Sequence, residues 1–372
     1  MRTACLHLAF LALALLAGRF TLSAEAATFY LVDIGHGNVA FVVSPSGETM
    51  LLDCGPGYVL NRIYDFMQQN GIKKIDYLVI SHFEEDHMGA SAALSKKVPI
   101  LNWVDHGESA VYGQSDEWWK QRRGPWARPG MGQADDKRFE DYKAARAAGR
   151  HIPVKAGDRV PIRGLDVVVV TAAGQNITKP LKGGGASNPV CSQVEKRAED
   201  DAEDGQSVGV VIADGKFRFT YLGDMTWNVS YRLFCPRNLI GTVDAYLVTH
   251  HAQSMSNRLG DYYAGLSCCS VAEAQGLNPR VALLSMGQQG HREGTADAIK
   301  TVLGVPGLDM WQTEKITGGG EAGFNSKDDF IANIGGERTE QVPFIKLAAN
   351  PDGSFTVSNS RNGFSKNYPP RK

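Results

Sequence analysis

The sequence has almost no net charge. It holds 39 Lys and Arg residues against 40 Asp and Glu residues, which gives a formal net charge of −1 over 372 residues. No strong overall field therefore draws in nucleic acid or an anionic membrane. The length suits one large domain or two ordinary ones, and the 41 glycines indicate many turns, as in a sheet-rich fold with short connections.

Long apolar runs are also scarce, and the main one lies at the N-terminus. Arg2 gives a positive start, an apolar stretch covers residues 6–17, and residues 24–26 (AEA) offer a small-residue cleavage site. The apolar stretch is short for a membrane span, and no second segment is long and apolar enough for one. We therefore predict a signal peptide over residues 1–26, a periplasmic or secreted protein, and no membrane span after cleavage.

The sequence has six cysteines, and an odd number of them remains after the predicted signal peptide is removed. Cys5 is lost with the predicted signal peptide, which leaves Cys54, Cys191, Cys235, Cys268 and Cys269. An odd number means that at least one thiol is unpaired or pairs with another chain. Cys191 and Cys235 lie in loop-like stretches and form the preferred disulfide. Cys54 is interpreted as a packed thiol, and the two adjacent cysteines stay open as alternative partners.

One short segment is rich in groups that bind metals. Residues 75–80 (IDYLVI) predict a buried strand, and residues 81–90 (SHFEEDHMGA) follow it. Two His, two Glu and one Asp fall within residues 82–87. Imidazoles and carboxylates at a strand end are costly to bury unless something satisfies them, and a divalent metal does so directly. An exposed acidic loop with two ordinary histidines is the alternative interpretation.

The residues of this segment resemble the His-x-His-x-Asp-His loop of the metallo-β-lactamase superfamily, with Glu84 at the second His position. The resemblance is strongest to the hydrolase domain of competence-type (ComEC-like) DNA-uptake proteins. Four further segments agree in order: 32–38 (VDIGHGN), 51–55 (LLDCG), 221–225 (YLGDM) and 248–256 (VTHHAQSMS). Five matches over roughly residues 28–300 make a specific signal. The many membrane helices of the uptake channel are missing here, so a DNA-uptake role is not implied.

The resemblance implies a divalent-metal cofactor, with one or two ions per chain. Its expected ligands are His82 and Glu84 for the first ion, Asp86, His87 and His251 for the second, and Asp224 as a bridge. Asp86 is also assigned a catalytic role. His291, in a late Gly-His step, is the second catalytic residue, because it could bind a phosphate oxygen or protonate a leaving group. Two adjacent ions can hold a hydroxide between them.

Four residues are expected around these ligands. Asp53 is expected to orient a ligand histidine or the loop rather than to bind metal. His250 is expected to lie behind the ligands or in the core. Alternatively, His250 binds the metal in place of His251. His36 replaces a Gln of the resembled motif and is either a turn residue or in contact with the site. Ser256 matches the second Ser after the His pair.

The superfamily's third histidine for the first metal has no counterpart. Only two histidines, His106 and His151, lie between Asp224 and residues 82–87, here called the metal loop. The residues around them do not match the superfamily's motif. Residues 204–207 (DGQS) stand where the ComEC-like pattern has Asn-x-Asn-Ser. We therefore expect a first site that is weak, labile or filled by a hard ion, with a single ion at the second site as the alternative. Zn is the first expectation, and Glu84 shifts the preference toward Mn or Mg.

Strands alternate with helices in two similar halves. This pattern predicts an α/β (α+β) fold, and it suits the αββα sandwich that the resemblance to the metallo-β-lactamase superfamily implies. The hydrolase domain is placed at residues 28–309. A helical insert rich in Trp, Arg and Lys is expected near residues 107–150. Residues 310–372 are interpreted as a small C-terminal β extension packed on the core.

The favoured function is an exported metal-dependent hydrolase that uses a metal-activated water on a phosphodiester. The partner is a small molecule or, alternatively, nucleic acid, because residues 118–128 offer aromatic and basic side chains for bases and phosphates. An amphipathic flap over the core is the favoured interpretation of that insert. Two other functions stay open. One is an acyl hydrolase acting on lactones or β-lactams, and the other is a non-catalytic binding protein with a degraded metal site.

Overall fold

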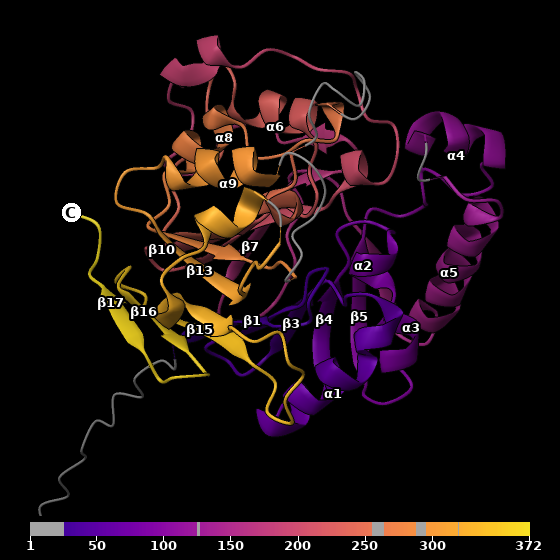
Figure 1. Cartoon of the computed structure of the whole chain (residues 1–372), viewed down its shortest axis with the longest axis horizontal. Helices are drawn as coiled ribbons and strands as arrows, with labels where there is room; N and C mark the ends of the chain where they lie inside the picture. Colours follow the sequence, from indigo (N-terminus) through magenta and orange to yellow (C-terminus); the bar gives the residue numbers. More distant parts are fainter. Residues whose placement is uncertain (1–25, 125–126, 255–263, 288–294, 319) are drawn as a thin grey trace, which may run out of the picture.

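The computed structural model describes residues 26–124, 127–254, 264–287, 295–318 and 320–372. Two β-sheets pack face to face, and helices cover both outer faces (Figure 1). This αββα sandwich confirms the fold class predicted from the alternating pattern. Within the described ranges, no helix is both long and apolar enough to cross a membrane.

The first sheet has nine strands in the order β17-β16-β15-β1-β2-β3-β4-β5-β6. Its strands are β1 (Ala27–Val32), β2 (Ala40–Val43), β3 (Thr49–Leu52), β4 (Ile75–Val79), β5 (Ile100–Asp105), β6 (Arg150–Pro153), β15 (Phe344–Ala349), β16 (Phe355–Asn359) and β17 (Ser365–Tyr368). Strands β3 to β6 run parallel, and the other neighbours are antiparallel. Strand β4 is buried along its whole length, as expected for a parallel strand covered on both faces.

The second sheet has eight strands in the order β14-β13-β12-β11-β10-β9-β7-β8. They are β7 (Asp166–Ala172), β8 (Gln175–Asn176), β9 (Gly209–Asp214), β10 (Phe217–Tyr221), β11 (Ala245–Leu247), β12 (Val281–Leu284), β13 (Asp309–Glu314) and β14 (Ile331–Asn333). Strands β10 to β14 are parallel. The carboxyl ends of parallel strands meet at one edge of a sheet, so the loops after β10 and β11 come together.

The helices lie in two outer layers and one insert. They are α1 (Leu60–Gln69), α2 (Glu85–Met88), α3 (Ser91–Leu94), α4 (Asp116–Arg123), α5 (Met131–Arg146), α6 (Trp227–Phe234), α8 (Val271–Leu277) and α9 (Thr295–Leu303). Apolar side chains of α1, α3 and α5 pack on the first sheet, and those of α6, α8 and α9 pack on the second. The central core lies between the sheets, where the rings of Phe29 and Phe219 have centroids 4.7 Å apart.

Helices α4 and α5 form the expected helical insert. Ser115 caps α4 by accepting a hydrogen bond from the Trp118 backbone N–H at 3.2 Å. Helix α5 is held at the end of β5 by Asp105, whose buried carboxylate accepts from the Tyr142 hydroxyl at 2.6 Å and from Arg146 Nη1 at 2.9 Å. The insert therefore stands beside the loop that follows β4.

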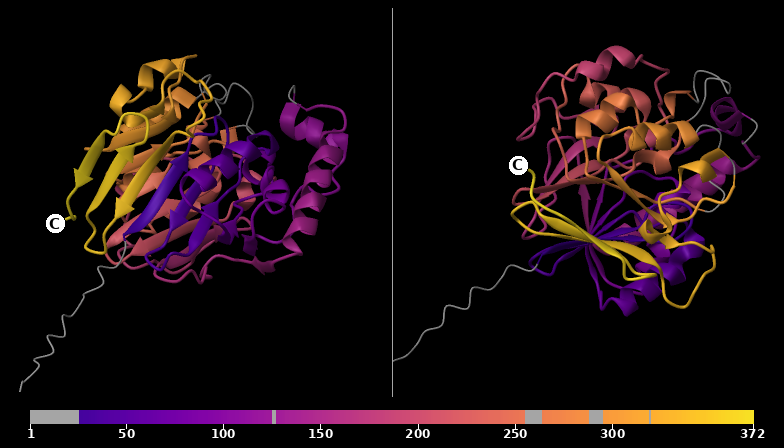
Figure 2. Two further views of the ribbon diagram at one scale, coloured as in Figure 1. Left: turned by 90° about the horizontal axis from the view of Figure 1, so that it is seen from below. Right: turned by 60° about the vertical axis from the view of Figure 1, so that its left-hand side comes forward.

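The C-terminal residues are shared between both sheets. Strands β13 and β14 extend the second sheet, whereas β15 joins the first sheet by antiparallel pairing with β1. Strands β15 to β17 and the helical insert lie at opposite ends of the sandwich (Figures 1 and 2). Residues 310–372 thus supply strands to both sheets. The domain boundary expected between residues 309 and 310 falls inside β13 (Asp309–Glu314).

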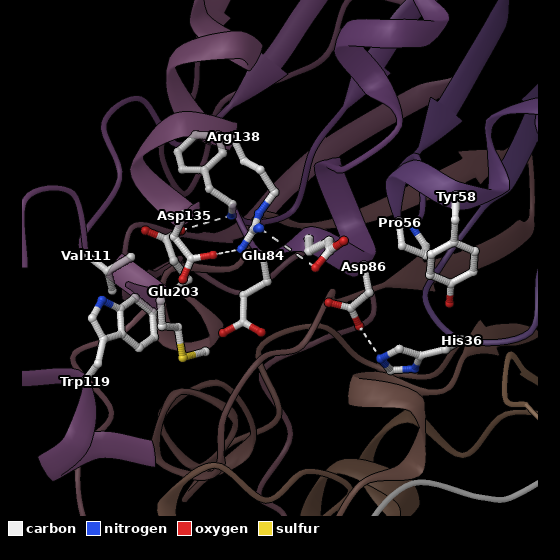
Figure 3. A pocket seen from close by; sticks show the side chains of 13 residues that line it. His36, Pro56, Tyr58, Glu84, Asp86, Val111, Trp119, Asp135, Arg138 and Glu203 are labelled. Atoms are coloured by element: carbon white, nitrogen blue, oxygen red, sulfur yellow. Dashed lines mark hydrogen bonds and ion pairs between the residues drawn. The ribbon is translucent and has the colours of Figure 1, made fainter. Parts of the chain in front are cut away.

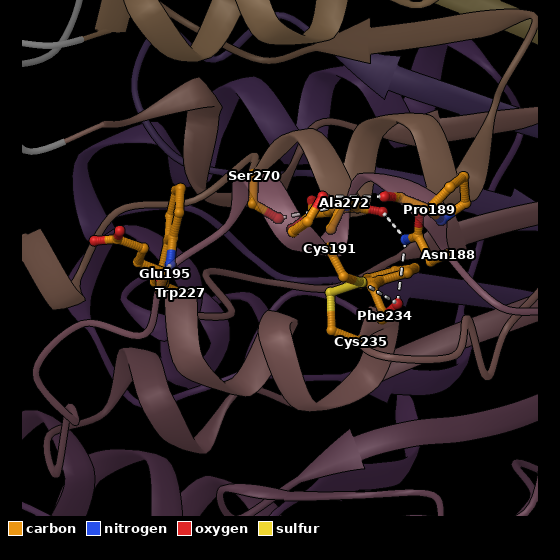
Figure 4. Close-up of a disulfide and its surroundings, with 11 residues drawn as sticks. Asn188, Pro189, Cys191, Glu195, Trp227, Phe234, Cys235, Ser270 and Ala272 are labelled. Atoms are coloured by element: carbon orange, nitrogen blue, oxygen red, sulfur yellow. Dashed lines mark hydrogen bonds between the residues drawn. A yellow bond between two sulfur atoms is a disulfide. The ribbon is translucent and has the colours of Figure 1, made fainter.

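The preferred disulfide is formed. Cys191 and Cys235 are bonded across 44 positions, and the nearby Asn188 side chain donates to the carbonyl oxygens of Phe234 and Ala272 (Figure 4). The neighbours Cys268 and Cys269 are bonded to each other. Cys54 is a free and fully buried thiol, as interpreted from the sequence, and burial raises its pKa.

Candidate metal centre

The candidate site lies where loops from both sheets meet. Residues 81–87 follow β4, Asp53 follows β3, Asp224 follows β10, and the His250–His251 pair follows β11. All of these positions lie at carboxyl ends of strands that pair in parallel with a neighbour. The topology therefore brings the motif residues of both halves to one place, although they come from two different sheets.

One group of possible ligands consists of Asp86, His87, Asp224 and His251, whose ligand atoms all lie within 4.8 Å of one another. His87 Nε2 lies 3.2 Å from Asp224 Oδ2 and 3.3 Å from His251 Nε2. His251 Nε2 lies 3.6 Å from Asp86 Oδ2. All four residues were predicted from the motifs. Two imidazoles and two carboxylates around one space form a donor set that zinc and similar divalent ions accept.

A second group consists of His82, Asp204 and Asp224. His82 Nε2 lies 3.5 Å from Asp204 Oδ1, and all three side chains are buried. Neither His82 Nε2 nor Asp224 Oδ1 has a hydrogen-bond partner in the described part of the chain. Buried polar atoms are rarely left unsatisfied, so these orphaned atoms fit a site that takes a cation. Asp224 belongs to both groups, which is the geometry of a bridging ligand.

Asp204 was not predicted from the sequence. It lies just before the strands of the second half, in the segment 204–207 (DGQS) that has no histidine. Its place next to His82 follows from a tertiary contact, because the Val208 backbone N–H donates to the Ser81 carbonyl at 2.8 Å. Glu84, the predicted ligand, belongs to neither group among the described residues and lines the adjacent cavity instead.

The two histidines considered for the third position are engaged elsewhere. His106 Nε2 lies 3.1 Å from Glu203 Oε2, and His151 Nε2 lies 2.9 Å from Asp105 Oδ1. Glu203 also accepts hydrogen bonds from the Phe83 and Ala110 backbone N–H groups. Although burial opposes ionisation, these partners lower the pKa of Glu203 to about 2. The Glu203 carboxylate therefore ties the metal loop to the segment that carries Asp204.

Asp53 contacts a ligand histidine and lies outside both groups. It is fully buried, and its carboxylate accepts from the Ser81 backbone N–H and from the Ser81 hydroxyl, both at 2.7 Å. The same carboxylate pairs with His87 Nδ1 and with the Tyr221 hydroxyl. Because Nδ1 is held by Asp53, Nε2, which faces Asp224, is the nitrogen that could bind a metal after losing its proton.

The loop of the His pair is fixed by buried hydrogen bonds. The Thr249 hydroxyl donates to Glu273 Oε1 at 2.7 Å, and the Ser230 hydroxyl donates to Glu273 Oε2 at 2.7 Å. Burial raises the pKa of Glu273. The His250 backbone N–H donates to the Gly223 carbonyl at 3.0 Å, which links the loop to the residue before Asp224.

His36 contacts the site, which was one of its two sequence interpretations. Its Nε2 lies 3.0 Å from Asp86 Oδ2, and its ring centroid lies 5.3 Å from that of His251. Two other expected residues, Ser256 and His291, lie outside the described residues. Their predicted roles stay predictions.

The electrostatics of the site are consistent with a cation. Burial lowers the pKa of His82, and the nearby His87 lowers it further, so the ring stays neutral and keeps a lone pair for a metal. Burial opposes the charged form of Asp224, but His87 and the His pair outweigh it and hold the pKa of Asp224 well below its usual range. Asp86 behaves in the same way. Burial opposes the charged form of His87, but Asp224, Asp86 and Asp53 outweigh it and hold the pKa of His87 well above its usual range. The His87 imidazolium thus balances the buried carboxylates, and a divalent ion would take the place of its proton.

A cavity of about 240 Å³ opens beside these groups. Asp86 and His36 form one wall, and Trp119 with other residues of the insert forms the opposite wall (Figure 3). Glu84 stands between the two walls. Arg138 lies above it and pairs with Asp135. The cavity therefore opens onto Asp86 from the side of the helical insert.

Comparisons with known proteins found several solved structures with some similarity to this chain. Similar solved structures include the diiron β-hydroxylase CmlA from Streptomyces venezuelae (15% identity, 77% of this chain, 52% of CmlA, TM-score 0.45). Others are Zn²⁺-bound PqqB from Methylobacterium extorquens (15%, 75% and 76%, 0.34) and the subclass B3 metallo-β-lactamase MEM-A1 from a soil metagenome (13%, 70% and 76%, 0.33). The chain spans about half the length of CmlA. At these identities and TM-scores, the likeness extends to neither substrate nor mechanism.

A search of curated proteins found no similar sequence. The family model described as the metallo-beta-lactamase superfamily matches residues 32–176, which contain Asp53 and the whole metal loop. The matched segment and the αββα sandwich agree, and the resemblance to ComEC-like proteins remains a finer hypothesis within that family. The match covers less than half of the 372 residues, and it shows that residues 32–176 are similar to the metallo-β-lactamase superfamily.

Proposed function

We propose that this protein is an exported metal-dependent hydrolase that acts on phosphodiester bonds. The observation that carries the proposal is the pair of buried ligand groups that share Asp224. When bound there, two divalent ions would lower the pKa of a water between them and stabilise both the attacking and the leaving oxygen. A non-catalytic binding protein would not need this combination of buried ligands with an adjoining cavity.

The residues of the chain have separate tasks in this proposal. Asp224 faces both groups and fixes their separation. Asp53 holds His87 in one tautomer, so that Nε2 needs no rearrangement to bind. His36 and Asp86 stand at the boundary between the ligand groups and the cavity, where the scissile bond would enter. The buried position of the other ligands restricts access of bulk water to that one side.

The cavity supports a small substrate rather than a nucleic acid strand. Glu84 and Glu85 line it, and their carboxylates would repel the successive phosphates of a polyanion. The two tryptophans in the described part of the insert are not free for stacking on bases either. Trp119 is buried, and Arg122 lies over the Trp118 ring at 4.7 Å while it pairs with Asp201. A single phosphodiester, neutralised by divalent ions, avoids these costs.

Export is supported by two features of the chain. The first is the N-terminal segment with its AEA site at residues 24–26. The second is the disulfide between Cys191 and Cys235, because such bonds persist mainly in oxidising compartments. We therefore propose that the mature chain begins near residue 27 and works in a periplasm or outside the cell.

The test is a hydrolysis screen of the mature protein supplied separately with Zn²⁺, Mn²⁺ and Mg²⁺. Bis-p-nitrophenyl phosphate is compared with a lactone and β-lactam panel and with single-stranded DNA. We expect metal-dependent cleavage of the small phosphodiester that falls more than about 100-fold in Asp224→Asn. Asp352→Asn, which removes the same charge from an exposed turn, is the matched control.

Other results of this screen would contradict the proposal. Cleavage of lactones or β-lactams alone would identify an acyl hydrolase. Degradation of DNA in preference to the small ester would restore nucleic acid as the substrate. Bound metal without turnover of any substrate class would leave the binding protein.

A further inference from the structure

The two consecutive histidines after β11 do not point to the same place. His251 Nε2 lies 3.6 Å from both Asp86 Oδ2 and Asp224 Oδ2. His250 Nε2 lies 3.5 Å from Asp224 Oδ2 and 3.9 Å from Asp204 Oδ2. The two ring planes are inclined by 72° with centroids 6.4 Å apart. His251 thus faces the Asp86 group, whereas His250 faces the Asp204 group.

The backbone conformation that separates the rings is unusual. His250 and His251 both have left-handed φ values, 49° and 50°. A residue with a side chain rarely adopts this conformation, because its Cβ then crowds the following carbonyl oxygen. Such strain persists where surrounding contacts fix it, and it is concentrated at functional sites. The bonds of Thr249 to Glu273 and of the His250 N–H to Gly223 supply those contacts here.

We infer that the two histidines serve different metal ions, His251 the second and His250 the first, and that His250 with Asp204 replaces the superfamily's missing third histidine. The first ion is then held by His82, Asp204, His250 and the shared Asp224. His250 is not part of the compact His82 group, but its Nε2 approaches two of that group's three members. This inference deepens the metal-dependent hydrolase proposal and rests on it.

The two sites then have the same donor set. Each has two imidazole nitrogens, one carboxylate of its own and the bridging carboxylate of Asp224. Such mixed sets suit Zn²⁺, Fe²⁺ and Mn²⁺, and they give no reason for one ion to be held more weakly than the other. The inference therefore replaces the expectation of a labile first site, and it assigns Glu84 to the cavity wall instead of the ligand shell (Figure 3).

The inference is tested by counting ions, which needs no substrate. The mature protein and its variants are loaded with Mn²⁺ alone or Zn²⁺ alone, dialysed, and measured by elemental analysis. His250→Asn and His251→Asn are used because Asn tolerates the left-handed backbone, so the substitution removes the imidazole without adding strain. Circular dichroism and thermal unfolding establish that each variant is folded. Asp201→Asn, an exposed neighbour, is the control for Asp204→Asn.

We expect about two ions in the wild type, in Glu84→Gln and in Asp201→Asn. Each of the three single variants at His250, His251 and Asp204 retains about one. The paired variants decide which ion each residue binds. Two substitutions at the same site remove one ion, whereas one substitution at each site removes both ions. The His250→Asn/Asp204→Asn protein still retains about one ion, whereas the His250→Asn/His251→Asn protein retains none.

Two ions in His250→Asn, or one ion in the His250/His251 pair, would overturn the inference. Loss of one ion in Glu84→Gln together with full occupancy in Asp204→Asn would also overturn it and return the ligand role to Glu84. One ion in the wild type would refute the inference and leave a mononuclear hydrolase intact. Two ions assigned as expected, without any hydrolysis, would instead refute the proposed function alone.

Discussion

The Nε2 atoms of His87 and His251 lie 3.3 Å apart although 164 positions separate the two residues in the chain. His87 follows a strand of the first sheet and His251 follows a strand of the second. The candidate metal centre therefore spans the interface between the two sheets. An ion bound there would join the two halves of the sandwich as well as supply the chemistry, which leads to the following predictions.

Replacing Asp53 by Asn should weaken metal binding without changing the ligands. Asp53 accepts from His87 Nδ1, and an amide at this position no longer stabilises that tautomer. We expect the affinity for the ion beside His87 to fall by about 10- to 100-fold. Titration against a chromophoric chelator measures the change, with the exposed substitution Asp352→Asn as the control. Unchanged affinity would show that Asp53 has only a packing role.

Removal of metal should lower the thermal stability of the protein. An ion that binds only the folded state stabilises it by about 2.7 kcal/mol when its free concentration is about 100-fold above its dissociation constant. We expect a strong chelator to lower Tm by several degrees, and re-addition of Zn²⁺ or Mn²⁺ to restore it. Differential scanning calorimetry measures both steps. A wild-type Tm that does not change when the chelator is added, and that equals the Tm of Asp224→Asn, would argue against a bound ion.

Glu203 should make the protein sensitive to acid. Its pKa is about 2 in the folded protein against an ordinary value of 4.5, so the ionised form stabilises the fold. This stabilisation is present above about pH 4.5 and is lost as the pH falls from there toward 2. It amounts to about 3 kcal/mol at the full shift.

The prediction for Glu203 is checked by urea unfolding of metal-free protein between pH 3 and pH 7. We expect Glu203→Gln to be less stable than the wild type at pH 7 and the difference to shrink toward pH 3. Asp201→Asn, two residues earlier and exposed, should not change the pH profile. Parallel profiles of Glu203→Gln and wild type would contradict the contribution of Glu203.

The disulfide between Cys191 and Cys235 should contribute strongly to stability. It closes a loop of 44 positions, and the chain-entropy relation gives about 4 kcal/mol for a loop of this length. We expect the Cys191→Ser/Cys235→Ser protein to unfold at a lower temperature than the wild type. A reductant should lower the Tm of the wild type far more than that of the double variant. An equal response of both proteins would point to the Cys268–Cys269 pair instead.

Much of the site could be predicted because its residues lie in local motifs. Residues 82–87 follow a strongly apolar strand, and Asp224 and the His pair also follow apolar strands, so residue type and position were visible together. The disulfide between Cys191 and Cys235 could also be predicted, because both cysteines lie in loop-like stretches of the sequence. Glu84 shows what local motifs do not decide. It fills a ligand position in the sequence pattern, but its side chain lines the cavity while Asp204 approaches His82.

The sequence alone determined the alternation of strands and helices, the placement of imidazoles and carboxylates at strand ends, and the αββα fold that buries those strands. Only the tertiary structure decided which carboxylate approaches which histidine. The spacing of apolar residues and the residue types describe each helix or strand by itself. The distance between two loops at strand ends depends instead on how the sheets and loops pack. The contact of Val208 with Ser81 and the left-handed backbone at His250 and His251 are such packing effects, and they place Asp204 and both histidines around the candidate metal centre.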